Sequence, residues 1–363
     1  MYIPQMLLDA EVLPLQARGC AVLGAGGGGS PRMGVLAALQ AIEEYGPVEL
    51  VDLDDLPDDG LIMGCGMVGA PTVSLEKFGN GQEVEWLRDR VEALTGRPVV
   101  ALMCTEIGGA NGCEPVAWAA RMGIPLVDAD GMGRAFPEMH QVSMHVAGVP
   151  SSPCVITDEQ ENVSVLYPTD GRWLERMCRS TAVLFGGRAV TSEYLMNAKQ
   201  ARTATVRGSV SLAINIGNLL ATASQNPVAQ LMEYLHGFQL IEGKIVDVDR
   251  QTAGGFVRGS VIVEGLGRDS GRLLRLEIQN ENLVALEDGR VLASVPDVIT
   301  VLDTQSADAI STELLRYGQR VTVVAFPCDP IWRTSGGLEV AGPRAFGYDF
   351  EFQKVEDIHH DFF

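Results

Sequence analysis

The sequence predicts an α/β protein: an N-terminal Rossmann-like parallel sheet with helices on both faces, followed by a C-terminal β-rich domain. Between residues 20 and 130, short apolar runs alternate with longer helical stretches, which is the pattern of a parallel sheet covered on both faces. From 238 to 324 the chain alternates apolar and polar residues and is rich in β-branched side chains, which is typical of antiparallel strands. We therefore expect an α/β domain over 1–165, and a second domain over 166–363 in which helices lead into the β-rich part.

The first domain is expected to begin with a short buried strand at 20–23. The glycine run 24–29 follows it, and Ser30 and Pro31 suit the cap and the first position of a helix. This helix is expected to end at Gly46, where the pattern stops. Further strands are predicted at 48–53, 61–63, 99–103 and 126–128, with helices at 84–94 and 117–122.

After about Pro150 the pattern changes. Segments 154–156 and 163–167 are predicted to pair as a hairpin around a polar turn. Helical stretches are predicted over about 170–185 and 190–222. In the β-rich part, strands are predicted at 246–249, 259–264, 273–278 and 298–302.

The chain is acidic, with 27 Lys and Arg residues against 47 Asp and Glu residues and a formal net charge of −20. This charge argues against a nucleic-acid or anionic membrane partner, and we expect a small-molecule substrate instead.

No apolar run is as long as a membrane span, and the N-terminal segment lacks the basic region of a signal peptide. The seven cysteines form no C-x-x-C pair. We expect a reduced, cytoplasmic protein that forms a homo-oligomer.

The glycine run 24–29 matches the dinucleotide-binding pattern G-x-G-x-x-G, between a predicted strand and a predicted helix. Asp52 lies at the end of the next predicted strand, where such sites place a ribose-binding carboxylate. The backbone at Gly26, Gly27 and Gly28 can approach a ligand closely, and the start of a helix favours an anion or a carbonyl oxygen. Three interpretations stay open: a nucleotide site, a site for another small ligand, and tight packing without a ligand.

Two polar loops are expected at one edge of the predicted sheet. Ligands of open α/β sheets bind outside the carboxyl ends of the strands, and 104–115 and 128–140 both follow strands at that edge. Carboxylates that cluster there raise one another's pKa and can donate or accept protons; alternatively, they bind a divalent cation. The candidate residues are Glu106, Asn111, Asp128, Asp130, Arg134 and Glu138.

Each candidate also has a structural interpretation. Asp128 taken alone is more often a helix cap or a turn former, and Arg134 can pair with Glu138 four residues on. His140 and His145 have the wrong spacing for two metal ligands on one helical face. A free cysteine is usually a small buried hydrophobic residue rather than a nucleophile.

Two polar segments of the second domain are further candidates for substrate binding. Arg207 and Ser209 interrupt an otherwise apolar helical stretch. Near the end of the chain, Arg333 and Arg344 lie among Gly, Pro and aromatic residues, where they would close a lid over an anionic or planar ligand. The alternative is a C-terminal tail that packs on the first domain.

Five segments of the chain are similar to those of one family: the glycine run, Thr105–Asn111, Asp130–Glu138, Arg207–Ser211 and Gly342–Asp349. Together they resemble the DUF917 family, described as S-methyl thiohydantoin desulfurase-like. The resemblance covers nearly the whole chain and is most specific in the acidic segment, although many relatives would carry glutamine at His140. It implies an N-terminal α/β domain, a C-terminal β-rich domain and an association with hydantoinase and oxoprolinase proteins, which open cyclic amides.

The function expected from these residues and this resemblance is hydrolysis of a thiohydantoin, hydantoin or related cyclic amide. An activated water would attack a carbonyl or thiocarbonyl carbon of the ring. Asp130 or Glu106 would be the base, with Asp128 in support. Arg134 and the N–H groups of the glycine run would stabilise charge, and Asn111 would orient the ring. No cofactor is required by this scheme, although a divalent metal held by the carboxylates is an alternative.

Two other functions stay open at this point. One is a nucleotide-binding oxidoreductase that uses the glycine run, and saturable binding of NAD or FAD would favour it. The other is a non-catalytic subunit of a hydantoinase- or oxoprolinase-type complex, which would show turnover only after its partner is added.

Overall fold

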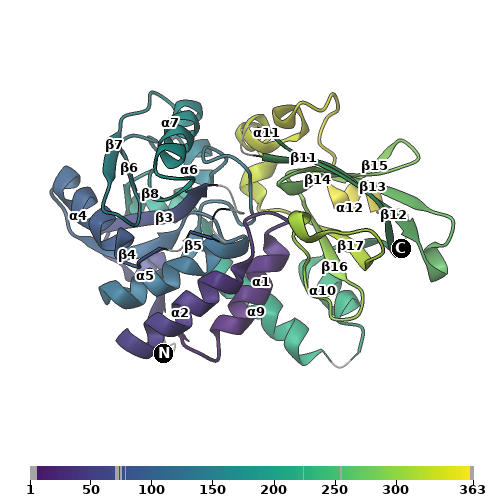
Figure 1. Cartoon of the computed structure of the whole chain (residues 1–363), viewed down its shortest axis with the longest axis horizontal. Helices are drawn as coiled ribbons and strands as arrows, with labels where there is room; N and C mark the ends of the chain where they lie inside the picture. The colour runs from purple at the N-terminus through teal and green to yellow at the C-terminus, as the bar shows by residue number, and fades with distance from the viewer. Residues whose placement is uncertain are drawn as a thin grey trace.

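The computed structural model describes residues 6–69, 73, 76–77, 79–223, 225–253 and 256–359. They form two halves that lie side by side, an α/β half and a β-rich half (Figure 1). The predicted fold class is confirmed, with the difference that the first sheet is mixed: parallel strands form its centre and antiparallel strands flank them.

Among the described residues, the first sheet has ten strands: β1 (Met6–Leu8), β2 (Val48–Val51), β3 (Leu61–Gly69), β4 (Val99–Cys104), β5 (Leu126–Asp130), β6 (Cys154–Thr157), β7 (Val163–Leu166), β8 (Arg188–Ser192), β9 (Met196–Asn197) and β10 (Val206–Arg207). Their order is β1-β2-β5-β4-β3-β8-β6-β7, and β10 and β9 pair with β5 and β3. The stretch β2-β5-β4-β3 is parallel. The predicted hairpin is present as β6 and β7, and β8 joins it to this sheet.

Helices cover both faces of the first sheet, because alternate strand residues contribute to two separate apolar clusters. Leu102 and Leu126 belong to one cluster, and Met103 and Val127 belong to the other. The first face packs against α1 (Leu13–Leu23), α2 (Pro31–Tyr45), α4 (Glu83–Thr95), α5 (Glu114–Met122) and α9 (Ser209–Thr222). The second packs against α6 (Ser143–Val146), α7 (Gly171–Leu184), α8 (Ala198–Ala204) and α11 (Ser335–Ala341). No helix in the described part of the chain is long and apolar enough to cross a membrane.

The strand predicted at 20–23 is wrong, since these residues form the last turn of α1. Four apolar residues in a row do not distinguish a buried strand from one turn of a buried helix. Small residues then let α1 and α9 approach closely: a Cβ at Gly19 would lie 1.8 Å from the carbonyl oxygen of Ala213, and one at Gly217 would lie 1.8 Å from that of Leu15. The glycine run therefore connects two helices, α1 and α2.

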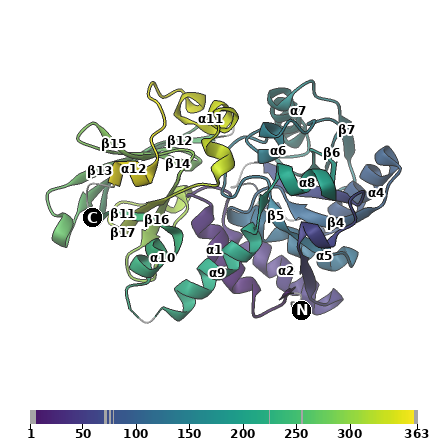
Figure 2. The ribbon, with the colours of Figure 1, turned by 180° about the vertical axis from the view of Figure 1, so that it is seen from behind.

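The helix predicted over 190–222 is also wrong, because this stretch is split into β8, β9, α8, β10 and α9. Asn197 and Gln200 form a capping box that starts α8. Gly208, with a φ of 74°, precedes α9. Figure 2 shows the short helix α8 and the longer helix α9 on the back of the molecule, where α9 lies along α1. The helix predicted over 170–185 is present as α7.

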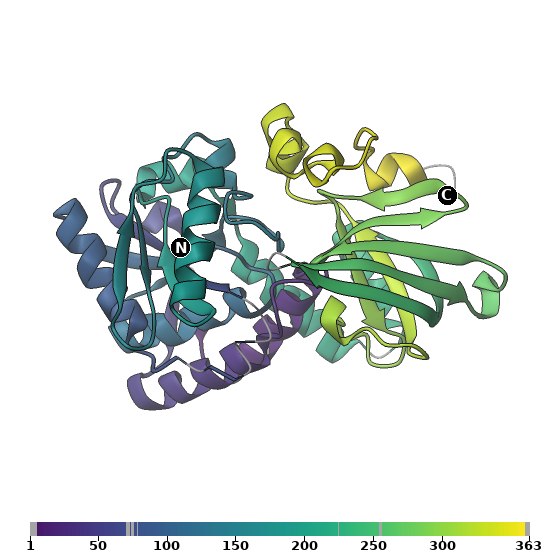
Figure 3. The same cartoon turned by 45° about the horizontal axis from the view of Figure 1, so that its top comes forward.

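The β-rich half contains an antiparallel sheet, and the four strands predicted there are present within it. Its apolar face buries the cluster that includes Ile241, Val261 and Leu276. Figure 3 shows its strands fanning out away from the α/β half. Among the described residues this sheet has seven strands. Each strand pairs with the next in the order β15 (Arg290–Ser294), β14 (Glu281–Glu287), β13 (Leu273–Gln279), β12 (Phe256–Gly265), β11 (Phe238–Ala253), β17 (Arg320–Phe326) and β16 (Val298–Asp303). Helices α10 (Pro227–Leu235) and α12 (Val355–His359) complete this half.

After β17 the chain returns from the β-rich half to the α/β half, where the segment that contains Trp332 and α11 packs. Trp332 is fully buried, its Nε1 donates to the carbonyl oxygen of Met132 at 2.7 Å, and its ring meets Phe136 edge-on at 4.8 Å. The alternative of a C-terminal tail that packs on the first domain therefore describes this part of the structure.

Candidate functional site

Hydrogen bonds join the loops at the carboxyl ends of β3, β4 and β5. Asn111 Oδ1 accepts the N–H of Met67 from β3 at 2.8 Å. The N–H of Ile107, after β4, donates to Asp130 Oδ2 at the end of β5 at 2.9 Å. The carboxyl ends of parallel strands share one edge of a sheet, and the structure brings the candidates of both polar loops together there.

Glu106 is a buried carboxyl at the centre of this region, 6% exposed. Its Oε2 accepts a hydrogen bond from Asn111 Nδ2 at 2.9 Å, and its Oε1 accepts the N–H of Phe136 at 3.1 Å. Burial raises the pKa of Glu106 to about 8, although these two hydrogen bonds and the charge of Arg134 oppose the shift. Glu106 can therefore gain or lose a proton close to neutral pH.

Asp130 is fully buried and interacts mainly with backbone. Its two oxygens accept the N–H groups of Ile107, Met132 and Gly133 at 2.9 to 3.0 Å. Burial raises the pKa of Asp130 to about 7, while these hydrogen bonds favour the ionised form and lower it. With backbone partners on both oxygens, Asp130 fixes the turn that leads to Arg134.

Arg134 is fully buried and reaches from this turn to the β-rich half. Its Nη1 donates to the carbonyl oxygens of Pro296 and Asp297 at 2.6 and 2.9 Å, and its guanidinium lies 4.5 Å from the ring centre of Phe136. Nη2 has no hydrogen-bond partner among the described residues. Burial lowers the pKa of Arg134 to about 10, and the charge of Glu281 opposes this, so the guanidinium stays protonated at neutral pH.

Glu281, the first residue of β14, brings a further buried carboxyl to this cluster. It is 2% exposed, and its Oε2 has no hydrogen-bond partner in the described part of the chain. Burial and the charge of Glu106 raise the pKa of Glu281 well above its ordinary value, and Arg134 lowers it. We name Glu106, Asn111, Arg134 and Glu281 the interdomain cluster.

The glycine run packs tightly beside this cluster. A Cβ at Gly26 would lie 2.7 Å from Asn282 Nδ2, one at Gly27 would lie 2.0 Å from Glu281 Oε1, and one at Gly28 would lie 2.3 Å from the carbonyl oxygen of Gly108. These glycines therefore allow close approach of other protein segments. The strand that precedes the glycines in a dinucleotide-binding motif is replaced by α1, so the predicted context of the fingerprint is wrong.

Asp128, in β5, holds the start of α9. Its Oδ1 accepts the N–H of Ser211 at 2.9 Å, and its Oδ2 accepts the hydroxyl of the same residue at 2.5 Å. Its carbonyl oxygen accepts the N–H of Gly208. Ser209, the first residue of α9, is buried, and its hydroxyl lowers the pKa of Asp130.

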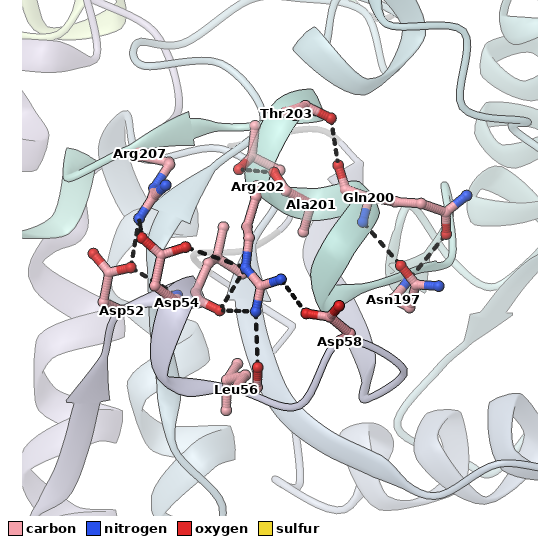
Figure 4. Close-up of polar contacts among 12 residues, drawn as sticks. Asp52, Asp54, Leu56, Asp58, Asn197, Gln200, Ala201, Arg202, Thr203 and Arg207 are labelled. Carbon is pink, nitrogen blue, oxygen red and sulfur yellow. Dashed lines mark hydrogen bonds and ion pairs between the residues drawn. The ribbon is translucent and has the colours of Figure 1, made fainter.

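Arg207 faces a different group of carboxylates. Figure 4 shows it beside Asp52 and Asp54, which it contacts at 2.5 and 2.7 Å through Nη2. Asp52 also accepts the N–H of Asp54, so it caps the turn after β2. Arg202 pairs with Asp54 and Asp58 in the same group. Arg207 thus joins β10 to the turn after β2 through these carboxylates.

Glu138 lies two residues after Phe136 and is not part of the interdomain cluster. Its side chain is 33% exposed, and its Oε2 lies 3.3 Å from His140 Nδ1. Burial lowers the pKa of His140 to about 4, so this histidine is neutral at physiological pH. Glu138 lines a groove that Glu106 and Arg134 do not line.

Arg344 is an exposed residue that contacts its own segment. Its guanidinium pairs with Asp349 and Glu351, and its side chain is 60% exposed. Arg333 instead pairs with the buried carboxylate of Asp297 at 2.7 Å. The two arginines of the predicted lid therefore have carboxylate partners within the protein.

Sequence reasoning missed Glu281 and Asp297. Asp297 is fully buried; it accepts from the N–H groups of Cys328 and Val355, and its carbonyl oxygen accepts from Arg134. Glu281 lies in a run of polar residues between two alternating segments, which looks like an ordinary hairpin turn. The sequence carries no signal that this turn meets the glycine run.

The seven cysteines are all buried and unpaired as disulfides. Burial raises the pKa of the Cys65 and Cys104 thiols well above the ordinary value, which favours the neutral thiol. In the described ranges, no three His, Cys, Asp or Glu side chains converge in a way that could hold a metal ion.

Comparisons with known proteins match nearly the whole chain. The N-terminal domain described as S-Me-THD-like matches residues 11–168, and the S-Me-THD-like C-terminal domain matches residues 169–355. A crystal structure of a protein from Chromobacterium violaceum is similar, with a TM-score of 0.78 and 23% identity over 96% of this chain and 100% of that chain, so the two share a fold. No curated protein matches the chain.

Proposed function

Because the chain belongs to the S-Me-THD-like family, we propose that it is a hydrolase of a thiohydantoin, hydantoin or related cyclic amide. One observation carries this proposal: Glu106, a buried carboxyl whose pKa is raised to about 8, lies within electrostatic reach of Arg134, a buried guanidinium with an unpaired N–H donor. A carboxylate that binds a proton near neutral pH can take one from water. A buried cation can stabilise the negative charge that then develops on the substrate.

In the proposed reaction, Glu106 accepts a proton from water while the water oxygen bonds to the thiocarbonyl or carbonyl carbon of the ring. Negative charge develops on the sulfur or oxygen of that group, where Arg134 Nη2 donates a hydrogen bond. With a thiohydantoin the C–S bond then breaks, both protons of the water end on the sulfur, and the oxygen stays on the carbon. The products are a hydantoin and hydrogen sulfide. With a hydantoin a ring C–N bond breaks instead, and the proton held by Glu106 passes to the leaving nitrogen.

The neighbouring residues act by positioning in this scheme. Asn111 is fixed by Met67 and in turn holds Glu106 Oε2. Asp130 holds the turn that carries Arg134. The N–H groups of the glycine run stay candidates for contacts with the substrate, whereas Glu138 lines a separate groove. Because the interdomain cluster is buried, the proposal requires the two halves to separate locally when substrate binds.

The test is a turnover screen over thiohydantoin, hydantoin and oxoproline, with and without a divalent metal. Turnover is measured as the release of sulfide and as the opening of the ring. We expect turnover of at least one of these rings, and a loss of kcat of about 100-fold or more in Glu106→Gln. Glu85→Gln is the matched control, because Glu85 is a partly exposed residue that pairs with Arg121 on the surface. No turnover by the wild-type protein, or full turnover by Glu106→Gln, would refute the proposal.

A further inference from the structure

A groove of about 490 Å³ lies along the outer side of α7. Arg172, Arg176 and Arg179 line it from successive turns of this helix, and residues spaced in this way share one helix face. Phe256, the first residue of β12, lines it from the β-rich half. Glu138 also lines the groove. The groove is thus formed by both halves of the molecule.

Two of the three arginines of the groove keep their guanidinium groups available. Arg172 and Arg176 are exposed, and neither makes a hydrogen bond or ion pair with another described residue; Arg176 stacks on the ring of Trp173 at 5.3 Å. Arg179 pairs with Glu175, and Glu175 Oε2 also accepts the N–H of Met139 at 2.9 Å. The carboxyl oxygens of Glu175 therefore contact Arg179 and Met139, and no hydrogen bond or ion pair joins them to Arg172 or Arg176 among the described residues.

The positive charge of this groove stands out on so acidic a chain. Burial and the charge of Glu175 raise the pKa of Glu138, whereas Arg172, Arg179 and Arg258 lower it. Several arginines therefore act on one carboxyl, although acidic residues outnumber basic ones 47 to 27 over the whole sequence. The lining of the groove carries three arginines against the two carboxyl groups of Glu138 and Glu175, and such an excess of positive charge attracts anions.

The groove also offers an apolar wall. Val183 is 71% exposed at the C-terminal end of α7, and the ring of Phe256 lies 5.0 Å from the guanidinium of Arg179. A ligand can therefore place an apolar surface against these side chains while its charged group meets the other arginines. Small-ligand sites commonly combine apolar walls with a few fixed polar groups.

We propose that this groove binds a small organic anion, whose carboxylate or phosphate group pairs with Arg172 and Arg176 and whose flat apolar part lies against Phe256 and Val183. Arginine suits both anions, because its planar guanidinium donates two parallel hydrogen bonds to them. This site is independent of the proposed hydrolase function, since Glu106 and Arg134 do not line the groove.

The test is calorimetric titration of the whole protein at low salt with benzoate, phenyl phosphate and benzamide. Benzoate and phenyl phosphate share an aromatic ring and distinguish the two anionic groups, and benzamide is the neutral counterpart of benzoate. We expect saturable binding of at least one of the two anions and none of benzamide. Arg172→Ala and Arg176→Ala should each weaken binding about tenfold, because each removes charge-assisted hydrogen bonds.

Arg90→Ala is the matched control, since Arg90 is an exposed arginine on another helix, α4, and does not line the groove. It should leave the affinity unchanged, and thermal melts of all three variants should match that of the wild-type protein. The proposal is overturned if neither anion binds saturably, if benzamide binds as well as benzoate, or if the Arg172 and Arg176 variants bind like Arg90→Ala. In each of these cases the arginines would form only a solvated helix face.

Discussion

Asn111 Nδ2 donates a hydrogen bond to Glu106 Oε2 at 2.9 Å. The same amide accepts the N–H of Met67 through Oδ1, so it ties the buried carboxyl to β3. The bond to Asn111 favours the ionised carboxylate and opposes the burial that raises the pKa of Glu106 to about 8. The protonation state of Glu106 therefore depends on a balance between burial and this amide.

The proposed base should give turnover a specific pH dependence. Glu106 acts when it is ionised, and with a pKa of about 8 its ionised fraction is small below that pH and increases through it. We expect kcat/KM to rise about tenfold per pH unit below the midpoint and to level off above it. A pH–rate profile of the wild-type enzyme checks this. A profile that is flat through neutral pH, or one whose midpoint lies in the ordinary range of a glutamate, would contradict it.

Removing the amide should move the same midpoint upward. Asn111→Ala deletes the hydrogen bond that lowers the pKa of Glu106, so the carboxyl should ionise only at higher pH and kcat/KM should rise later in the profile. Asn162→Ala is the control, because Asn162 makes a similar bond to Asp158 in a turn that does not include Glu106. An unchanged or lower midpoint in Asn111→Ala would show that this amide does not set the protonation of Glu106.

Arg134→Lys tests the unpaired donor. Lysine keeps a positive charge but lacks the second terminal nitrogen that is unpaired in Arg134. We expect kcat to fall about 100-fold with little change in KM, as for loss of one donor to a developing anion. Arg121→Lys serves as the control, because Arg121 forms a surface pair with Glu85. Kinetics that match the control would remove Arg134 from the proposed mechanism.

Asp128 should matter for stability and leave turnover intact. Its carboxylate accepts both the N–H and the hydroxyl of Ser211 at the start of α9, and loss of such a cap costs about 1 kcal/mol. Asp128→Ala should therefore lower the free energy of unfolding by that amount in urea titrations, and Asp128→Asn should lower it less because one acceptor oxygen remains. If Asp128→Ala loses turnover at unchanged stability, Asp128 supports the base as the sequence suggested.

The glycine run should be intolerant of a methyl group. Gly28 has a φ of +70°, and a Cβ there would lie 2.3 Å from the carbonyl oxygen of Gly108. Gly28→Ala combines backbone strain with a clash against backbone, so it should destabilise the protein by at least about 2 kcal/mol. Gly336→Ala is the control: Gly336 lies in α11 with ordinary backbone, and the added Cβ would meet Val146 at 3.4 Å. Equal unfolding free energies for the two variants would show that the loop relaxes.

The sequence predicted the strands of the α/β half better than its first helix. Buried parallel strands such as 99–103 stand out as short apolar runs between helices, and the structure places β4 there. The run 20–23 has the same appearance, yet it is the end of a helix whose earlier turns contain glycine and polar residues. The identity of such a run depends on what packs against it, and here that partner is α9, nearly 200 residues later.

The candidate site was predictable only where it depends on sheet topology. Glu106 follows β4 and Asp130 ends β5, and because these strands are parallel their loops had to emerge at one edge of the sheet. Glu281 could not be placed in this way, because it starts a strand of the other sheet and meets the cluster only through packing between the halves. Its partners are determined by tertiary structure rather than by local pattern.

The contacts of the glycine run have a consequence for biosynthesis. Asn282 donates through Nδ2 to the carbonyl oxygen of Ala25 at 2.9 Å, across a separation of 257 residues, and the N–H of Thr312 donates to that of Gly26. During synthesis this loop is made before Asn282 and Thr312, the residues that bind it through these hydrogen bonds. All strands of the first sheet precede β14 in the sequence, so a nascent chain can complete this sheet before it acquires the interdomain cluster.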